Sequence, residues 1–479
     1  MEFAYRMRKS MLTVIAAALT ALGCQAQPPR EVFEPVRFED GTPVTGDAAA
    51  DSLFARDRFL TDTTVTGKGD TLLVVRHASA FIRMQVDGLP LGAGRLLLAP
   101  VSGEVRTIPV TEPGRLVLWM AGDPGGFPAA AAVAEAPDGR LWSVRLPALD
   151  LRSGTAYRWE GTLLPPDAPA SSLRAGPLPQ TAMDIDPGEY SGITWLGGDR
   201  YAVVSDRLPG SGLLYFTIPV DGSGNVGSVS VRRAGWKDDG AGKSRDPEGI
   251  AFVPSSGTLF ITSEKHQEIR GYDLAGDGTG TALRVPEDLK DISGNRGFEA
   301  LTFQAATGMF WTTTEAPLRR DTFLPRILRL QRFDADGEPA GRFFYQMDEP
   351  LRSAGGTAAY VHGVPALAAL DDGRLLVLER EVFVPGGGFW DKLRNAFTEI
   401  RIYAVDPGRD SAGILRKSPL CSFRTGALNL ANFEGMCLGP VLPDGRRCLL
   451  LIADSQNGSG GLTGEWLKVI LLSEDGDGF

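Results

Sequence analysis

The sequence predicts an all-β protein in which a β-sandwich is followed by a five- or six-bladed β-propeller. First, 59 Gly and 33 Pro among 479 residues imply many turns. Second, short alternating apolar segments before residue 165 have the period of strands rather than helices. Third, one type of segment recurs five times after residue 184. A chain of this length also exceeds what a single hydrophobic core usually supports, so two domains are expected.

The first 50 residues are expected to direct export and to link the protein to a membrane. Basic residues within MEFAYRMRKS precede the apolar run MLTVIAAALTALG, which is too short for a mature membrane-spanning helix and is typical of a signal peptide over residues 1–23. The following ALGC resembles a bacterial lipobox with Cys24 as the lipidated residue, and cleavage after Ala26 is the alternative. Residues 24–50, rich in Pro, Gly, Ala and Asp, then suit a flexible tether. We therefore expect a protein that is lipid-anchored in the bacterial cell envelope, at the outer membrane or in the periplasm.

The net charge restricts the partners of the protein. The formal charge is -10, and the first 23 residues contain three basic residues and one acid, so the remainder is near -12. Nucleic acids and anionic membrane surfaces bind clustered positive charge. We therefore expect no nucleic-acid partner, and we expect membrane contact only through a lipid anchor. An acidic protein more readily binds cations.

Residues 51–165 have the pattern of a β-sandwich domain. Stretches such as DTLLVVRH, SAFIRMQVDG and GRLWSVRLP alternate with Gly, Pro and Asp, and about seven strands in such a domain suggest two packed sheets. The ending LDLRSGTAYRWEGTLL weakly resembles the last strands of fimbrillin-like sandwiches of surface lipoproteins. Residues 166–183, within the Pro-rich run PPDAPASSLRAGPLPQ and its continuation, are expected to link this domain to the next.

Residues 184–473 consist of a repeated unit. The copies are SGITWLGGDRYAVVSD (191–206), EGIAFVPSSGTLFITSE (248–264), EALTFQAATGMFWTTTE (299–315), PALAALDDGRLLVLE (365–379) and EGMCLGPVLPDGRRCLLLIAD (434–454). Each copy is followed by one or two further strand candidates, which gives three to four strands per unit and is typical of a propeller blade. The last unit lacks a fourth strand at the C-terminus. Residues around 178–186 could supply it and close the ring.

The repeats place acids at two fixed positions. The opening residues are Ser191, Glu248, Glu299, Pro365 and Glu434, and the closing residues are Asp206, Glu264, Glu315, Glu379 and Asp454. The innermost strand of each blade lines the central channel, so equivalent residues of all blades form a ring. Like charges brought close cost stability unless a cation or a basic side chain offsets them.

Two explanations for the ring are open. In the structural one, each acid binds backbone N–H groups or an Arg and fastens neighbouring blades. In the functional one, the closing acids Asp206, Glu264, Glu315, Glu379 and Asp454 bind Ca²⁺ or a similar hard cation, which prefers carboxylate oxygens. The cation would then assist ester hydrolysis of a small anionic or ester substrate. The residues expected to act on the substrate are Glu248, Glu299, Glu434, Arg320 and Arg380.

Several segments resemble the signature segments of the phytase-like family, which is also named for an esterase-like activity of phytase. They are DPEGIAF with ITSE, NRGFEALTF with TTTEAPLRRD, LLVLERE, and NFEGMCLGP with GRRCLLLIADSQN. The resemblance covers nearly all of residues 184–473. It implies a propeller and phosphoester or ester hydrolysis.

The resemblance marks thirteen motif positions: Asp206, Asp246, Glu248, Glu264, Asn295, Glu299, Glu315, Asp321, Glu379, Arg380, Asn432, Glu434 and Asp454. Pro365 departs from the pattern, because it stands where an acid is usual. Since one fold serves many functions, a non-catalytic propeller that binds a ligand or protein at the cell surface is the alternative.

Two further features remain open. Cys437 and Cys448 flank the turn GPVLPDGR and are either a disulfide or two buried thiols. The insertion VFVPGGGFWDKLRNAF, residues 382–397, either overhangs the channel or has a packing role.

Overall fold

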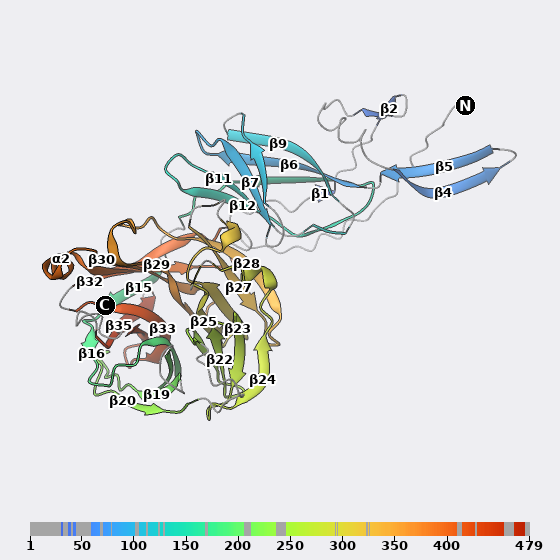
Figure 1. Cartoon of the computed structure of the whole chain (residues 1–479). Helices are drawn as coiled ribbons and strands as arrows, with labels where there is room; N and C mark the ends of the chain where they lie inside the picture. Colours follow the sequence, from blue (N-terminus) through green and yellow to red (C-terminus); the bar gives the residue numbers. More distant parts are fainter. Residues whose placement is uncertain are drawn as a thin grey trace. The chain divides into compact units, whose positions relative to one another are not determined.

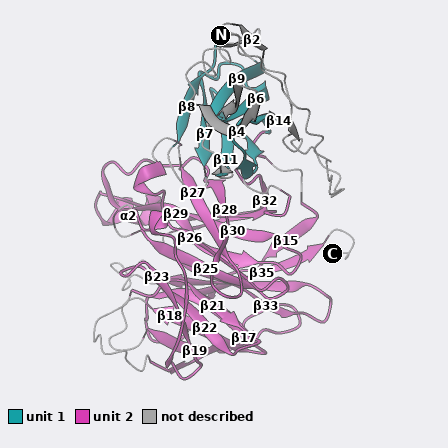
Figure 2. Cartoon of the chain, turned by 90° about the vertical axis from the view of Figure 1, so that its right-hand side faces the viewer, with its two compact units in different colours: residues 1–164 teal, residues 165–479 magenta. Residues whose placement is uncertain are grey.

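The computed structural model describes residues 30–31, 37–39, 42–44, 59–67, 70–77, 79–100, 105–111, 114–122, 125–127, 130–167, 171–205, 212–235, 246–292, 294, 296–321, 324, 326–409, 414–426, 429–454 and 464–474 (Figure 1). The chain divides into two compact units, Met1–Leu164 and Pro165–Phe479 (Figure 2). The expected signal peptide and the expected lipidation site Cys24 lie outside the described residues. Within the described residues, no helix is both long enough and apolar enough to cross a membrane.

The first unit contains a β-sandwich, as the sequence predicts. Its two four-stranded sheets have the orders β1–β14–β6–β9 and β12–β11–β7–β8. The strands are β1 (Arg30–Glu31), β14 (Ala156–Thr162), β6 (Ala80–Leu89), β9 (Gly114–Gly122), β12 (Leu141–Leu146), β11 (Ala130–Glu135), β7 (Arg95–Pro100) and β8 (Arg106–Pro109). One buried cluster contains Met84 and Trp159 from the first sheet and Leu96 and Ala132 from the second. The two sheets therefore share a core, because alternate residues of a strand face the same side.

Three strand pairs accompany the sandwich. They are β2 (Arg37–Glu39) with β3 (Thr42–Val44), β4 (Phe59–Gly67) with β5 (Asp70–His77), and β10 (Gly125–Phe127) with β13 (Leu149–Leu151). Strand β1 pairs with β14, so residues 30–31 of the expected tether belong to a sheet of this unit. The expected tether, residues 24–50, also contains β2 and β3, so backbone pairing makes the expectation of a flexible segment wrong at residues 30–31, 37–39 and 42–44.

The second unit is a propeller whose described residues form five antiparallel sheets, or blades (Figure 1). From the inner to the outer strand, the first blade contains β17 (Tyr190–Gly197), β18 (Arg200–Ser205), β19 (Leu213–Thr217) and β20 (Ser230–Arg233), and the second contains β21 (Ile250–Val253), β22 (Thr258–Ser263), β23 (Glu268–Tyr272) and β24 (Gly278–Leu283). The third blade contains β25 (Phe298–Gln304), β26 (Met309–Thr314), β27 (Ile327–Phe333) and β28 (Pro339–Gln346), and the fourth contains β29 (Thr357–Ala369), β30 (Leu375–Pro385), β31 (Phe397–Val405) and β32 (Lys417–Gly426). The fifth blade contains β33 (Asn432–Val441), β34 (Arg447–Asp454), β35 (Trp466–Glu474) and β15 (Leu173–Pro177). The inner strands β17, β21, β25, β29 and β33 each contact the next, and β33 contacts β17. The ring is therefore closed.

The fifth blade combines strands from both ends of the unit. Strand β15 pairs with β35 in antiparallel register, and the two-residue strand β16 (Thr181–Ala182) pairs with β35 as well. Closure by an N-terminal segment is as the sequence predicts, but the outer strand comes from 173–177 rather than from 178–186. The expectation that 166–183 is only a linker is therefore wrong, because these residues complete the hydrogen bonding of β35.

Apolar clusters between neighbouring blades hold the propeller together. Leu376 and Ile400 of the fourth blade pack with Phe433 and Leu449 of the fifth, and similar clusters lie between the other neighbouring blades. Cys437 and Cys448 are buried free thiols, which decides the alternative that the sequence left open. The insertion of the fourth blade contains helix α2 (Phe389–Asn395). The 3-10 turn η1 (Glu287–Leu289) precedes the third blade, and η2 (Arg319–Asp321) lies between β26 and β27 of that blade.

Candidate functional site

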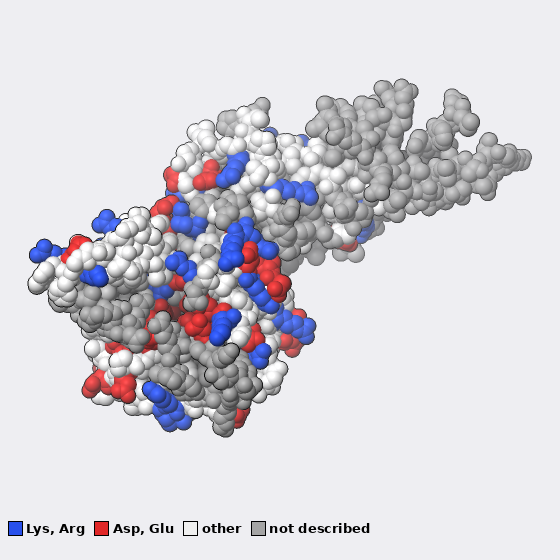
Figure 3. All heavy atoms as spheres, viewed as in Figure 1, with Lys and Arg blue, Asp and Glu red and all other residues white. Residues whose placement is uncertain are grey.

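Six carboxylates gather at one end of the propeller, and we call them the acid cluster. They are Asp246, Glu248, Glu264, Glu299, Glu315 and Glu434. Each lies just before or at the start of an inner strand, or directly after the end of the second strand. Antiparallel hairpins bring these two kinds of position to the same end of a blade. Figure 3 shows Asp and Glu side chains gathered beside Lys and Arg on one face of the second unit.

Glycines bring the inner strands close enough to form this cluster. A Cβ atom on Gly192 would lie 2.2 Å from the carbonyl oxygen of Glu248, and one on Gly249 would lie 2.5 Å from that of Glu299. Gly435 approaches the carbonyl oxygen of Ser191 in the same way. Each of these glycines follows an opening residue, so the dipeptides Ser-Gly and Glu-Gly of the repeat set the diameter of the ring.

One side of the cluster has the donor set of a cation site. Asp246, Glu248 and Glu264 each offer a carboxylate oxygen, and these three oxygens lie within 4.8 Å of one another. The backbone N–H of Gly297 donates to Glu264 Oε1 at 2.7 Å, which fixes that carboxylate. Burial raises the pKa of Glu264 to about 7, and the hydrogen bond from Gly297 offsets only part of this effect. Carboxylates held this closely favour a hard cation, so this side fits Ca²⁺ or a similar ion.

The other side of the cluster is neutralised by Arg380. This guanidinium is only 3% exposed. Its Nη2 atom donates to Glu315 Oε1 at 2.5 Å, and its Nη1 atom donates to Glu434 and, at 2.8 Å, to Asn432 Oδ1. Burial alone would lower the pKa of Arg380, but the charges of Glu434 and Glu315 raise it overall. Arg380 therefore remains charged and pairs with two acids that would otherwise be available to a cation.

Glu299 and Glu434 hold protons more strongly than exposed carboxylates. Burial, together with the charges of Glu248 and Glu315, raises the pKa of Glu299 well above its ordinary value. Burial also raises the pKa of Glu434, although Arg380 acts in the opposite direction. Within the part of the chain that the structure describes, Glu299 accepts no hydrogen bond. A carboxyl group in this state is suited to hold or move a proton.

The family model for the esterase-like activity of phytase, named phytase-like, matches residues 185–456. The chain belongs to the phytase-like family. The match covers most of the propeller, without β15 and β35 of the fifth blade, and does not reach the first unit, so the fimbrillin-like resemblance there remains a prediction. No curated protein matches the chain.

Solved structures similar to the phytase-like chain are distant in sequence. An aldose sugar dehydrogenase from Streptomyces coelicolor, in its PQQ-bound form, has 16% identity and a TM-score of 0.34, and the match covers 64% of this chain and all of that one. The periplasmic gluconolactonase of Pseudomonas aeruginosa has 15% identity and a TM-score of 0.27, over 78% and 95% of the two chains. The virginiamycin B lyase of Staphylococcus aureus has 11% identity and a TM-score of 0.27, over 87% and 99%.

Two residues expected in the site of the phytase-like propeller lie elsewhere. Glu379 is buried against the third blade, where it accepts hydrogen bonds from the hydroxyl of Tyr345 at 2.6 Å and from Lys417 at 2.7 Å. It is therefore no metal ligand, since its oxygens already have partners. Arg320 faces Asp291, with 3.6 Å between Nε and Oδ2, and its side chain is 42% exposed. It makes no described contact with the acid cluster and is therefore not placed to act on a substrate there.

The remaining predicted ligands have different outcomes. Asp206 and the motif residue Asn295 lie outside the described residues. Asp454 is buried, and Asn432 Nδ2 donates to it at 3.4 Å, so it lies beside the half of the site that Arg380 neutralises. Glu264 and Glu315 belong to the acid cluster, but to opposite sides of it.

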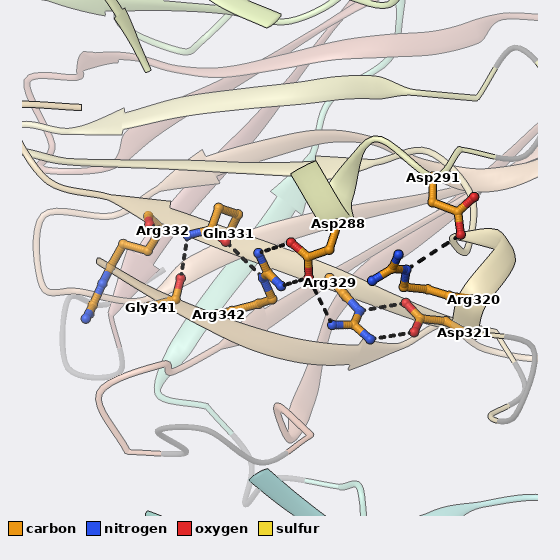
Figure 4. Close-up of polar contacts among 9 residues, drawn as sticks. All are labelled: Asp288, Asp291, Arg320, Asp321, Arg329, Gln331, Arg332, Gly341 and Arg342. Atoms are coloured by element: carbon orange, nitrogen blue, oxygen red, sulfur yellow. Dashed lines mark hydrogen bonds and ion pairs between the residues drawn. The ribbon is translucent and has the colours of Figure 1, made fainter. Parts of the chain in front are cut away.

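The motif residue Asp321 has a structural role. It is fully buried, and both of its carboxylate oxygens accept hydrogen bonds from Arg329, at 2.7 and 2.6 Å. Figure 4 shows this pair beside Asp288 and Arg342, which are also joined by hydrogen bonds. These contacts fasten η1 and η2 to the outer strands β27 and β28. A bidentate pair of this kind positions loops and leaves no oxygen for a ligand.

Sequence reasoning missed Arg296 and did not assign Asp246 to the site. Both were inside segments quoted for the family resemblance, NRGFEALTF and DPEGIAF. Arg296 is one residue before the glycine that binds Glu264, and Asp246 has a left-handed backbone with φ of 54°. A non-glycine residue in that conformation is uncommon and indicates a constrained loop, which the sequence alone does not reveal.

Proposed function

We propose that this phytase-like propeller hydrolyses phosphate or carboxylic esters with the help of Ca²⁺ held by Asp246, Glu248 and Glu264. The proposal rests on one observation, the three carboxylate oxygens within 4.8 Å of one another. When bound, the cation would stabilise charge that develops on a phosphoryl or carbonyl oxygen and would polarise a water molecule. The N-terminal sequence supports a location outside the cytoplasm, with this protein itself anchored in the cell envelope.

The residues around the cation site have separate tasks in this proposal. Glu299 carries the proton that the leaving alkoxide oxygen takes up, since its raised pKa keeps it protonated more than an exposed carboxyl group. Arg380 does not bind substrate, because its N–H groups already donate to Glu315, Glu434 and Asn432. It instead prevents Glu315 and Glu434 from repelling the ester.

A second function is favoured by the same Arg380 contacts. An arginine of the fourth blade that binds acids of the third and fifth blades is what a structural staple requires, and a propeller built this way can bind a ligand without catalysis. In that case the remaining acids would hold a cation that stabilises the ring. Catalysis is the distinguishing property.

The test is an assay of purified residues 27–479 against phytate, simple phosphate monoesters and carboxyl esters, with Ca²⁺ and with chelator. We expect turnover only with Ca²⁺. Glu248→Gln should weaken Ca²⁺ binding about 10- to 100-fold, by loss of one charged ligand. Glu299→Gln should bind Ca²⁺ normally and lose about 10²-fold or more of kcat, as expected for a proton-transferring group. Glu287→Gln, a carboxylate that is 87% exposed at η1, is the matched control.

Two outcomes would refute the hydrolase. One is the absence of turnover on every ester although Ca²⁺ binds. The other is full activity of Glu299→Gln. Ca²⁺ binding that raises the melting temperature without any turnover would instead favour the non-catalytic propeller.

A further inference from the structure

Arg296 has a partly exposed side chain whose guanidinium group lies beside the acid cluster. Its side chain is 38% exposed, and its Nε atom lies 3.9 Å from Glu315 Oε2, beyond hydrogen-bonding distance. Within the described part of the chain no residue accepts a hydrogen bond from it. This distinguishes it from Arg380, whose guanidinium is buried and bonded, and from Arg320, which faces Asp291. Of the arginines that the structure describes beside the cluster, Arg296 is therefore the one with donors left for a ligand.

The backbone next to Arg296 is fixed by the cluster itself. Gly297 donates its N–H to Glu264 Oε1 at 2.7 Å and accepts the backbone N–H of Glu315 at 2.9 Å. A larger residue there would require the side chain of Gln267 to move, because a Cβ atom on Gly297 would lie 2.2 Å from Gln267 Nε2 and 3.0 Å from Glu264 Cγ. The residue after Arg296 is thus held between the two closing acids. An arginine that starts from a fixed backbone loses less freedom when it binds a ligand.

The charge of Arg296 is available because Glu315 has another partner. Glu315 Oε1 is hydrogen-bonded to the buried Arg380, so its charge is largely compensated before Arg296 approaches. Gly297 also connects Arg296 to Glu264, which belongs to the proposed cation site. An anionic group at this position would meet the guanidinium and a bound cation together. The guanidinium or the cation alone would have to offset the repulsion between the anionic group and the remaining carboxylates.

We propose that Arg296 is the oxyanion-binding residue of this site and that its substrates contain a phosphoryl or carboxylate group beside the scissile bond. The proposal rests on the proposed function, since it uses the cation held by Asp246, Glu248 and Glu264. The planar guanidinium donates two parallel hydrogen bonds to such a group. A neutral ester lacks this partner and gains nothing from Arg296.

The test is isothermal titration of the chain with inorganic phosphate and, separately, with acetate, each with and without Ca²⁺. We expect phosphate to bind only in the presence of Ca²⁺. Arg296→Gln should weaken that binding at least tenfold and leave Ca²⁺ affinity unchanged, while Arg296→Lys should restore part of it, since the charge returns without the fork. Arg284→Gln removes an arginine that is 75% exposed and paired with Glu338, and should change nothing. Acetate that binds more tightly than phosphate would identify a carboxylate as the group recognised.

The outcomes separate this proposal from the hydrolase. The proposal would be overturned if Arg296→Gln bound phosphate and acetate each as tightly as the unaltered chain does. It would also be overturned if the unaltered chain bound neither anion in the presence of Ca²⁺. If no ester is hydrolysed but Arg296→Gln loses phosphate binding, the hydrolase is refuted and the oxyanion site stands. If esters are hydrolysed, Arg296→Gln should raise KM for p-nitrophenyl phosphate and leave KM for p-nitrophenyl acetate unchanged.

Discussion

At the scale of single residues, Arg380 decides which acids of the ring remain available. Lys265 and Arg380 both follow a closing acid directly in the sequence, but Lys265 is exposed and Arg380 is buried. The difference arises from position in the blade. Ile250 pairs with Ile261 as Leu367 pairs with Val377, so Arg380 stands at the position of Glu264, and Lys265 lies one residue beyond it. β22 ends at Ser263, just before Glu264, whereas β30 continues to Pro385. Alternation along β30 therefore directs Glu379 and Arg380 to opposite faces of their sheet.

Replacing Arg380 should be severely destabilising, and more so at high pH. Arg380→Met leaves Glu315 and Glu434 buried without their partner, which typically costs about 3–5 kcal/mol. Glu434 already has a pKa raised above its value in the unfolded chain, and this shift grows without Arg380. An acid of this kind favours folding below its ordinary pKa and opposes folding as the pH rises. Urea unfolding at about pH 5 and about pH 8 should show the larger loss at about pH 8.

The control for this measurement is Arg424→Met in the same blade. Arg424 pairs with Glu399, but its side chain is 54% exposed. A pair exposed to this degree contributes at most about 1 kcal/mol. A loss of similar size in the two variants, or a loss at Arg380 that does not depend on pH, would contradict the role assigned to Arg380.

At the scale of elements, the repeat revealed the strands and their order but not the closing position of the fourth blade. Alternating apolar residues identify strand pairs, because half of each strand faces a neighbouring blade. The same shift in register occurs at the opening residue of the first, third, fourth and fifth blades. Ala366 pairs with Leu378 as Ala300 pairs with Thr313, so Arg380, and not Glu379, stands at the position of Glu315. Aligning the copies by their terminal acids misplaces Glu379 by one residue, because strand pairing and not residue type fixes which positions are equivalent. The same limit concealed Arg296, which is outside the repeated positions.

The structural role of Glu379 gives a prediction at this scale. Glu379 joins β30 to two other segments, since it accepts hydrogen bonds from Tyr345, from Lys417 and, at 3.0 Å, from the backbone N–H of Asp348. Glu379→Gln should lower the free energy of unfolding by about 1–3 kcal/mol, the cost of a buried hydrogen-bonded group that loses its charge. Lys417 keeps Asp348 as a partner, which limits the loss. Ca²⁺ affinity should not change, in contrast to Glu248→Gln, and a weakened Ca²⁺ affinity in Glu379→Gln would return Glu379 to the ligand set.

At the scale of the whole molecule, the ring is closed by a strand whose sequence lacks the usual features of a strand. The segment LRAGP of β15 is short, contains Gly and Pro, and has no apolar alternation, so it reads as a linker. Its place at the outer edge of the fifth blade permits this composition. The N–H of Leu178 donates to Val469, and with the register of β15 on β35 this directs the N–H groups of Arg174 and Gly176 inward. Pro177 then falls at a position whose nitrogen faces away from β35, where proline is tolerated.

This alternation allows closure to be tested by two neighbouring prolines. Arg174→Pro removes an N–H that bonds to β35, and should lower the free energy of unfolding by about 1–3 kcal/mol and the melting temperature of the propeller with it. Ala175→Pro removes an N–H that faces outward and should cost clearly less. Arg174→Ala controls for the side chain, which donates to the carbonyl oxygen of Ser171. Because the five inner strands form one closed ring, weakening a single outer strand should destabilise all blades together. The unfolding curve should therefore show one transition at a lower temperature, and no additional transition before it. Equal effects of the two prolines would mean that β15 does not close the ring.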